Sequence, residues 1–194
     1  MTRTQPHVIA RGRIVILREK QIDDAERDYS WRRDPELAEY DAARPISMSL
    51  RSFVQTVSDE LEHPSPYRRT YAIEDPATGT HIGNVMYYGY ERERQQTELG
   101  ITIGNRDYWS RGYGTDAVRT MLGVLFDELR VRRVFLHTLT WNDRAQIAFR
   151  RAGFRDVGQV HRAGYDFIRM EVSREEFDAQ RAADRSEGAS PPEG

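Results

Sequence analysis

The spacing of apolar and polar positions changes repeatedly along this chain, between the period of strands and the period of helices. Short β-branched runs bounded by turn residues predict strands over 14–17, 70–74, 81–90, 97–103, 133–139, 157–160 and 164–172. A repeat near 3.6 residues predicts helices over 23–32, 49–61, 116–129 and 145–154. Strands and helices in this order indicate an α/β fold with a mixed, partly parallel sheet and helices on both faces.

Local signals support the helix boundaries. Ser49 stands where an N-cap is expected, and Gly153 stands where a helix is expected to stop. The apolar residues of the helix over 49–61 share one face, which we expect to lie in the core rather than in a substrate pocket: Phe53, Val54, Val57 and Leu61.

A glycine-rich turn, Arg111-Gly112-Tyr113-Gly114-Thr115, lies between the strand over 97–103 and the helix over 116–129. Without a Cβ, Gly112 and Gly114 let a ligand approach the main chain closely. Free N–H groups and the positive end of the helix dipole would then favour an anion such as a diphosphate. A short glycine motif is equally compatible with an ordinary strand-to-helix turn. The motifs on either side of it in the sequence therefore decide between an anion site and an ordinary turn.

Composition narrows the function classes. The chain has 194 residues, a length that fits one domain. Its net charge is only −2, so the excess of positive charge that is typical of nucleic-acid-binding proteins is absent from its composition. It has no cysteine, which excludes disulfides and a cysteine acyl-enzyme, and its histidines show no ligand spacing, so no metal is expected. No apolar run is long enough to span a membrane or resembles a signal peptide, and we expect a cytoplasmic protein.

We expect three segments: an N-terminal extension over 1–8, one domain over 9–176, and a disordered tail over 177–194. The end of the chain, from Gln180 onward, has no apolar residue larger than alanine. Such a segment cannot bury enough surface to offset the entropy cost of ordering it.

Several short motifs keep a characteristic order along the chain, and they lie at 12–18, 23–25, 31–36, 82–85, 109–114, 142–154 and 165–170. Over residues 9–173 this order and spacing resemble the GNAT superfamily of N-acetyltransferases, and within it the branch of the ribosomal-protein N-terminal acetyltransferases. Trp109 departs from the family's loop pattern, which has Gln or Arg at that position.

The resemblance implies a single-domain GNAT fold with a central sheet of about seven strands. It also implies that the fourth and fifth strands, here over 97–103 and 133–139, splay apart to hold acetyl-CoA as cosubstrate. The pantetheine would pair with the fourth strand and the pyrophosphate would bind the glycine turn. The implied cofactor contacts are Leu99, Ile101, Thr102, Ile103, Arg111, Gly112, Tyr113, Gly114, Thr115, Asn142 and Phe149.

Two residues are candidates for the chemistry. Glu98 falls beside the expected splay point, where a carboxylate could accept the proton of the attacking amine. It could instead orient the amine or form a structural pair. Asn142 resembles the family's asparagine near the cofactor and equally fits a plain N-cap.

Phe149 is the main departure from the family. Many relatives place there a tyrosine that protonates the leaving thiolate, and a phenyl ring cannot do so. Either another group, such as Tyr113, Thr138 or Tyr165, supplies the proton, or the thiolate leaves unassisted. His137 could face the cleft, although a single histidine in a strand is more often packed or half exposed than catalytic.

The leading hypothesis is therefore an acetyl-CoA-dependent N-acetyltransferase in which a primary amine attacks directly within a ternary complex. The acceptor would be a protein or peptide α-amine or a small amine, and acidic residues such as Glu39 and Asp41 would suit a cation. Trp31, Tyr40, Arg44 and Tyr87 are further candidates for the acceptor pocket. A different donor such as succinyl-CoA, or a non-catalytic CoA-binding protein, stays open, and a homodimer through edge strands is compatible with the sequence.

Overall fold

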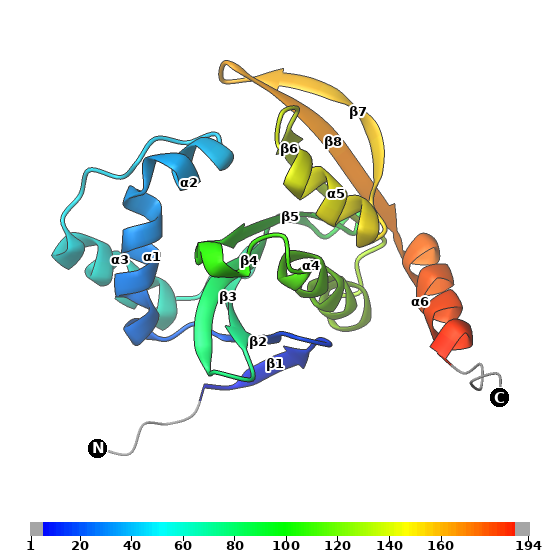
Figure 1. Ribbon diagram of the computed structural model, residues 1–194, viewed down its shortest axis with the longest axis horizontal. Helices are drawn as coiled ribbons and strands as arrows, with labels where there is room; N and C mark the ends of the chain where they lie inside the picture. The colour runs from blue at the N-terminus through cyan, green and yellow to red at the C-terminus, as the bar shows by residue number, and fades with distance from the viewer. Residues whose placement is uncertain (1–5, 189–194) are drawn as a thin grey trace.

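A computed structural model describes residues 6–188 of the chain, and its strands form one eight-stranded sheet (Figure 1). The strands are β1 (Val8–Arg11), β2 (Ile16–Glu19), β3 (Arg69–Asp75), β4 (Thr80–Glu91), β5 (Gln96–Ile103), β6 (Arg133–Leu139), β7 (Arg155–Arg162) and β8 (Tyr165–Ser173). The α-helices are α1 (Ala25–Arg33), α2 (Pro35–Tyr40), α3 (Leu50–Glu62), α4 (Tyr113–Gly123), α5 (Asp143–Arg151) and α6 (Arg174–Gly188). The α/β prediction is confirmed.

The order of strands in the sheet is β1-β2-β3-β4-β5-β6-β8-β7. All neighbours are antiparallel except β5 and β6, which are parallel and pair only at their first residues. The last paired residues are Glu98 and Phe135, after which the two strands separate. The fold therefore contains the splay that the resemblance implied.

Helices cover both faces of the sheet. Helix α4 contacts β1, β2, β4 and β5, and its Val118 and Met121 are fully buried in the core with Val85 of β4. Asn84, the next residue to Val85 along β4, faces the opposite side and donates a hydrogen bond to Asp28 of α1 at 2.7 Å. Figure 1 shows α4 and α5 in front of the sheet and α1 to α3 together at one side.

The C-terminal prediction was wrong as far as residue 188. Residues 174–188 form helix α6, whose first turn buries Phe177 against Phe126, with ring centroids 5.0 Å apart. Arg181 adds an ion pair to Asp127 at 2.8 Å. Composition alone did not predict this helix, because a single buried residue, Phe177, holds its first turn against the core and the residues that follow favour a helix. Residues 189–194 lie outside the described residues.

Three smaller differences separate the structure from the sequence predictions. Strand β1 begins at Val8, inside the expected extension, and the short helix α2 was not predicted. In α3 no residue is fully buried, so its apolar face is only partly covered and Leu61 is exposed. The predicted N-cap of α3 is confirmed, because Ser49 Oγ accepts a hydrogen bond from the Ser52 amide at 3.2 Å.

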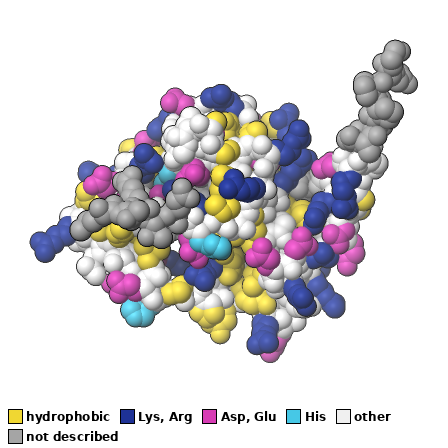
Figure 2. Space-filling view, turned by 90° about the horizontal axis from the view of Figure 1, so that it is seen from below, with side chains coloured by type: hydrophobic (Ala, Val, Ile, Leu, Met, Phe, Trp, Pro, Cys, Tyr) yellow, Lys and Arg dark blue, Asp and Glu magenta, His cyan; other side chains and the backbone are white. Residues whose placement is uncertain are grey.

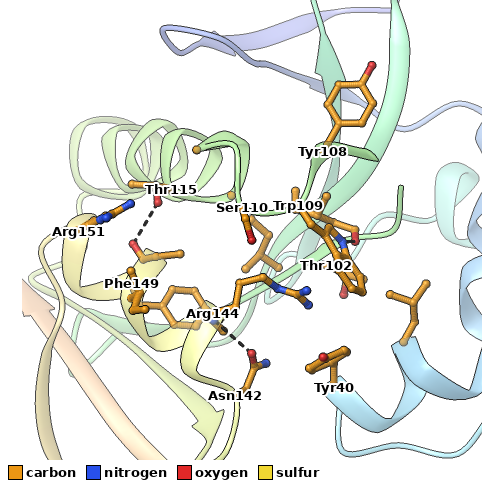
Figure 3. A pocket seen from close by; sticks show the side chains of 18 of the residues that line it. Tyr40, Thr102, Tyr108, Trp109, Ser110, Thr115, Asn142, Arg144, Phe149 and Arg151 are labelled. Atoms are coloured by element: carbon orange, nitrogen blue, oxygen red, sulfur yellow. Dashed lines mark hydrogen bonds between the residues drawn. The ribbon is translucent and has the colours of Figure 1, made fainter. Parts of the chain in front are cut away.

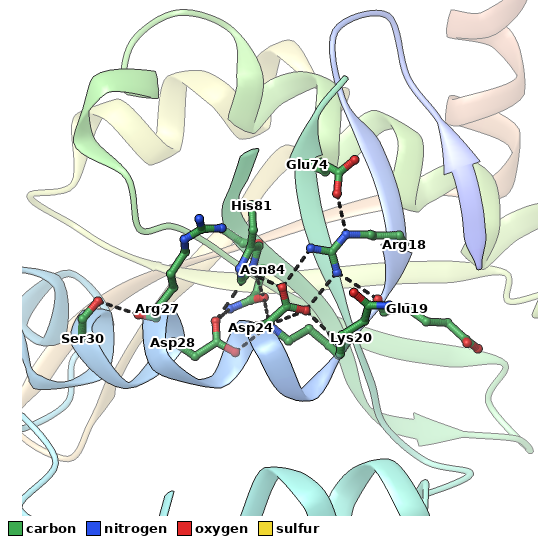
Figure 4. Close-up of polar contacts among 12 residues, drawn as sticks. Arg18, Glu19, Lys20, Asp24, Arg27, Asp28, Ser30, Glu74, His81 and Asn84 are labelled. Carbon is green, nitrogen blue, oxygen red and sulfur yellow. Dashed lines mark hydrogen bonds and ion pairs between the residues drawn. The ribbon is translucent and has the colours of Figure 1, made fainter. Parts of the chain in front are cut away.

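A buried charge network connects the start of α1 to the sheet (Figure 4). Arg18 donates two hydrogen bonds to Asp24, at 2.8 and 2.9 Å, and a third to Glu74 at 2.6 Å. Lys20 contacts Asp28 at 2.6 Å. Burial acts to raise the pKa of Asp24, but Arg18 and the nearby positive charges outweigh it and lower the pKa to about 2.

The surface seen from below interleaves acidic, basic and apolar side chains (Figure 2). Across residues 6–188, no helix combines the length and the apolar character that crossing a membrane requires. Within the same residues, no cluster of His, Cys, Asp and Glu has the composition to hold a metal ion.

Candidate active site

A cleft of about 520 Å³ lies where β5 and β6 separate (Figure 3). Its walls come from the end of β5, the glycine turn, α5 and α2. Predicted cofactor residues that line it are Ile101, Thr102, Ile103, Gly112, Gly114, Thr115, Asn142 and Phe149. The residues that were singled out at distant points of the sequence therefore share one cavity.

The glycine turn has the geometry of an anion cradle. Gly112 has a φ of +89°, which side-chain-bearing residues rarely adopt, and it is the N-cap of α4. The first main-chain bond of the helix runs from the Asp116 amide to the Gly112 carbonyl at 3.0 Å, so the preceding amides have no partner within the helix. A Cβ on Gly112 or Gly114 would meet no atom closer than 3.8 Å, so the space above the turn is open.

Asp116 fixes this end of α4 to the turn between β1 and β2. Its carboxylate accepts hydrogen bonds from the amides of Arg13, Ile14 and Val15 at 3.1, 2.7 and 3.1 Å. Gly12 is required beside it, because a Cβ there would lie 2.5 Å from Asp116 Oδ2. The cradle is therefore held by the first strands of the chain, about a hundred residues away.

Trp109, which departs from the family pattern, has a structural role in this turn. Its indole N–H donates to the Ile103 carbonyl at 2.6 Å and so connects the turn to the end of β5. The guanidinium of Arg144 stacks on the Trp109 ring at 3.5 Å and lies 4.7 Å from the Tyr40 ring. Figure 3 shows Arg144 reaching across the cleft between these rings. Tyr40 was a candidate for the acceptor pocket, but the stacking of Arg144 on the two rings was not predicted, because the three residues come from different elements.

On α5, Asn142 is the N-cap, as its Oδ1 accepts a hydrogen bond from the Ala145 amide at 3.2 Å. It is nearly buried and lines the cleft as well, so the structure fits both of its expected roles. Phe149 is 7% exposed, with its ring packed against Phe154 at 6.1 Å between centroids. It offers the cleft an apolar wall and no proton.

Glu98 lies at the last pair of β5 and β6 and does not itself line the cleft, whereas Thr102, on the same face of β5, does. Its Oε1 is 2.8 Å from Nδ1 of His137 on β6, and both side chains are nearly buried. Tyr88 of β4 is the cross-strand partner of Glu98. Burial, and then the Glu98 carboxylate, raise the pKa of the Tyr88 hydroxyl, so it stays protonated.

The side chains of three predicted cofactor residues lie elsewhere. Leu99 is in the core, and Arg111 and Tyr113 do not line the cleft. Arg111 instead donates to the Asp107 carbonyl at 3.0 Å and lies 6.0 Å from the Tyr113 ring. Only their main-chain groups could reach a ligand in the cleft.

Of the residues predicted to line the acceptor pocket, some line the cleft and others lie elsewhere. Tyr40 and Asp41 line the cleft, whereas Tyr87 is in the core. The Trp31 ring packs against His81, at 4.9 Å between centroids. Asp41 contacts Thr102 Oγ1 at 3.3 Å. Although solvent reaches Asp41 from the cleft, dense protein around it raises its pKa.

Comparisons with known proteins agree with this geometry. The model of the acetyltransferase (GNAT) domain matches residues 15–155. A protein described as an uncharacterized N-acetyltransferase p20 of Bacillus licheniformis is 23% identical over 122 residues, which are 62% of this chain and 67% of that protein.

Solved structures show the same fold at low identity. Spermidine N-acetyltransferase of Vibrio cholerae, in complex with CoA and spermine, has a TM-score of 0.74 and 18% identity, over 84% of this chain and 97% of that chain. AAC(6')-Ib, in complex with Parmomycin and acetyl-CoA, has a TM-score of 0.72 and 22% identity, over 87% of this chain and 98% of that chain. Another structure of AAC(6')-Ib describes it as an aminoglycoside acetyltransferase.

The family model covers well over half of the chain, and the matched residues contain both the splayed strands and the glycine turn. Enzymes of this family transfer an acyl group from CoA to an amine, and acetyl-CoA is their cosubstrate. The chain belongs to the GNAT acetyltransferase family.

Proposed function

We propose that this protein transfers the acetyl group of acetyl-CoA to a primary amine by direct attack within a ternary complex. The observation that carries this proposal is the splay after Glu98 and Phe135, which opens directly onto the glycine turn. The cleft satisfies the requirements of an extended diphosphate ligand: unpaired amides at the start of α4, open space above two glycines, and an apolar wall on α5.

The residues of the chain divide the work between binding and proton transfer. The amides of the glycine turn would bind the pyrophosphate, and the unpaired edge of β5 beyond Glu98 would hold the pantetheine amides. The amine would approach Glu98, whose carboxylate accepts the proton that the nitrogen must lose. Phe149 leaves the thiolate without a tyrosine donor from α5, so solvent would protonate it.

The acceptor we favour is a small amine with more than one positive charge. Asp41 supplies a carboxylate on the wall of the cleft, and the aromatic rings of Tyr40 and Trp109 suit cations. Two of the solved neighbours are described as a spermidine N-acetyltransferase and an aminoglycoside acetyltransferase, which supports an acceptor of this kind. A peptide N-terminus, which the ribosomal-protein branch would imply, is the competing acceptor.

The first experiment is calorimetric titration with acetyl-CoA, succinyl-CoA and free CoA. Gly114→Glu places an acid in the cradle without strain, because Gly114 lies in the first turn of α4 and a Cβ there meets only Ile103 at 3.8 Å. Gly123→Glu is the matched control, since it adds the same charge at the other end of α4 where nothing lies within 4 Å. We expect Gly114→Glu to abolish binding and Gly123→Glu to keep it.

Turnover is then measured as thiol release with spermidine, an aminoglycoside and a peptide with a free α-amine. Wild-type turnover with any of them supports the enzyme, and the preferred amine identifies the acceptor class. Glu98→Gln should lower kcat by about 10²-fold or more while keeping acetyl-CoA affinity. Binding without turnover would instead support a non-catalytic CoA-binding protein, the alternative that Phe149 favours.

A further inference from the structure

His137 is the one histidine of the described chain that pairs with a group at the splay point. Its Nδ1 lies 2.8 Å from Glu98 Oε1, and the two side chains are 10% and 13% exposed. Its pairing with Glu98 was not predicted, because the two residues are 39 positions apart and meet only through the register of β5 on β6.

Aromatic neighbours fix the orientation of this imidazole. The ring of Phe135 lies 5.9 Å from it on the same strand, and the ring of Phe167 on β8 lies 6.3 Å away, both nearly perpendicular. With these rings on two sides, the histidine has little freedom to turn its Nδ1 away from Glu98.

Other charged and titratable groups surround the pair from three strands. Tyr88 on β4 stands directly across from Glu98, and Arg169 on β8 stands directly across from His137. Arg169 is itself engaged, with Glu171 at 2.8 Å and with its guanidinium 4.3 Å above the Phe135 ring. Arg162 of β7 lies over the Phe167 ring at 5.4 Å.

We propose that His137 is a positioning residue that holds the Glu98 carboxylate in the orientation needed to accept the proton of the amine. This inference rests on the proposed function. In the transfer, the amine nitrogen forms a bond to the carbonyl carbon and the carbon–sulfur bond breaks. The proton leaves nitrogen for the Glu98 carboxylate, which Tyr88 also contacts by a hydrogen bond, and the sulfur departs with its electron pair as a thiolate that solvent protonates. His137 keeps its Nδ1 proton throughout.

A hydrogen bond to a charged carboxylate has a predictable kinetic effect. Without the donor, Glu98 samples other rotamers and its charged form loses a stabilising partner. The loss of one such bond corresponds to a fall of about 10- to 100-fold in kcat. Because neither His137 nor Glu98 lines the cleft, the affinity for acetyl-CoA should not change.

The test compares two variants of His137 with a control on the β7–β8 hairpin. His137→Phe keeps a ring and removes the donor, whereas His137→Asn keeps a donor near the Nδ1 position. His161→Phe is the matched control, because His161 Nδ1 also pairs with a carboxylate, that of Asp166 at 2.7 Å, but both side chains are 68% exposed. Each protein is assayed for acetyl-CoA affinity, for kcat and KM of the best amine, and for the pH dependence of kcat/KM.

We expect His137→Phe to lower kcat about 10- to 100-fold and to move the acid limb of the kcat/KM profile to higher pH, with KM and acetyl-CoA affinity within about twofold. His137→Asn should recover most of both changes, and His161→Phe should match the wild type. An unchanged profile in His137→Phe, with or without a lower kcat, would overturn the inference, because a packing defect lowers the rate without moving the limb. Absence of turnover in the wild type would instead refute the proposed function itself.

Discussion

Removal of the Asp116 carboxylate tests how the cradle is held. In Asp116→Ala, the amides of Arg13, Ile14 and Val15 lose their shared acceptor. The Val15 amide loses it in the interior, since that residue is 1% exposed, whereas Arg13 and Ile14 are exposed and water can replace the carboxylate there.

These differences in burial determine how much each lost hydrogen bond reduces the free energy of unfolding. A buried hydrogen bond to a charged acceptor contributes roughly 1.5–3 kcal/mol, and an exposed one about 0.5–1 kcal/mol. One buried and two exposed bonds give a loss of about 2.5–5 kcal/mol in the free energy of unfolding, a large share of the roughly 5–15 kcal/mol by which a typical domain is stable. For a chain of this size the melting temperature should fall by about 10 °C.

The assay is urea unfolding followed by circular dichroism, with Asp178→Ala as control. Asp178 forms an exposed ion pair with Arg174 at 2.8 Å, whose loss should leave the unfolding midpoint close to that of the wild type. Asp116→Asn should lie between the wild type and Asp116→Ala, because one oxygen remains. A loss below about 1 kcal/mol in Asp116→Ala would show that these amides do not depend on the carboxylate.

Three further predictions concern buried groups. Gly104→Ala should destabilise the fold by about 2 kcal/mol, measured by urea unfolding, because a Cβ there would lie 2.0 Å from the Trp31 ring; an unchanged midpoint would contradict the packing. An amine-reactive reagent should leave Lys20 unmodified in the folded protein, as mass spectrometry can show, because Lys20 is the sole lysine and its side chain is 9% exposed; labelling of Lys20 before unfolding would be the contrary result. The folded pKa of Asp24, about 2, lies below its ordinary value of 3.8, so its contribution of about 2 kcal/mol is present above pH 4 and lost as the pH falls toward 2. Asp24→Asn should show less acid sensitivity than the wild type in urea unfolding at pH 6 and pH 3, and an equal sensitivity would be evidence against this role.

Features that depend on neighbouring residues in the sequence were predicted well. The strand over 133–139 coincides with β6, and the caps at Ser49 and Asn142 bond as expected. Glycine-rich turns and caps carry their physical cause within a few residues, so a single sequence reveals them.

Features that depend on contacts between distant elements were not predicted. Helix α6 depends on Phe177 reaching Phe126, and the cation in the cleft depends on Arg144 of α5 reaching Trp109. No local pattern separates an arginine that stacks inside a cleft from one in solvent, and many arginines in this chain are exposed.

The pairing of Glu98 with His137 shows why such contacts escape prediction. Both lie on strands that were predicted, but their contact requires the parallel register in which Glu98 stands beside Phe135. A slip of one residue would turn His137 to the opposite face, and nothing in either strand alone forbids it. Burial fixes the register: Val134 and Leu136 enter the core on the face opposite to His137, together with Thr97 and Leu99 of β5. The core that closes one face of the sheet therefore determines which charged groups meet on the other.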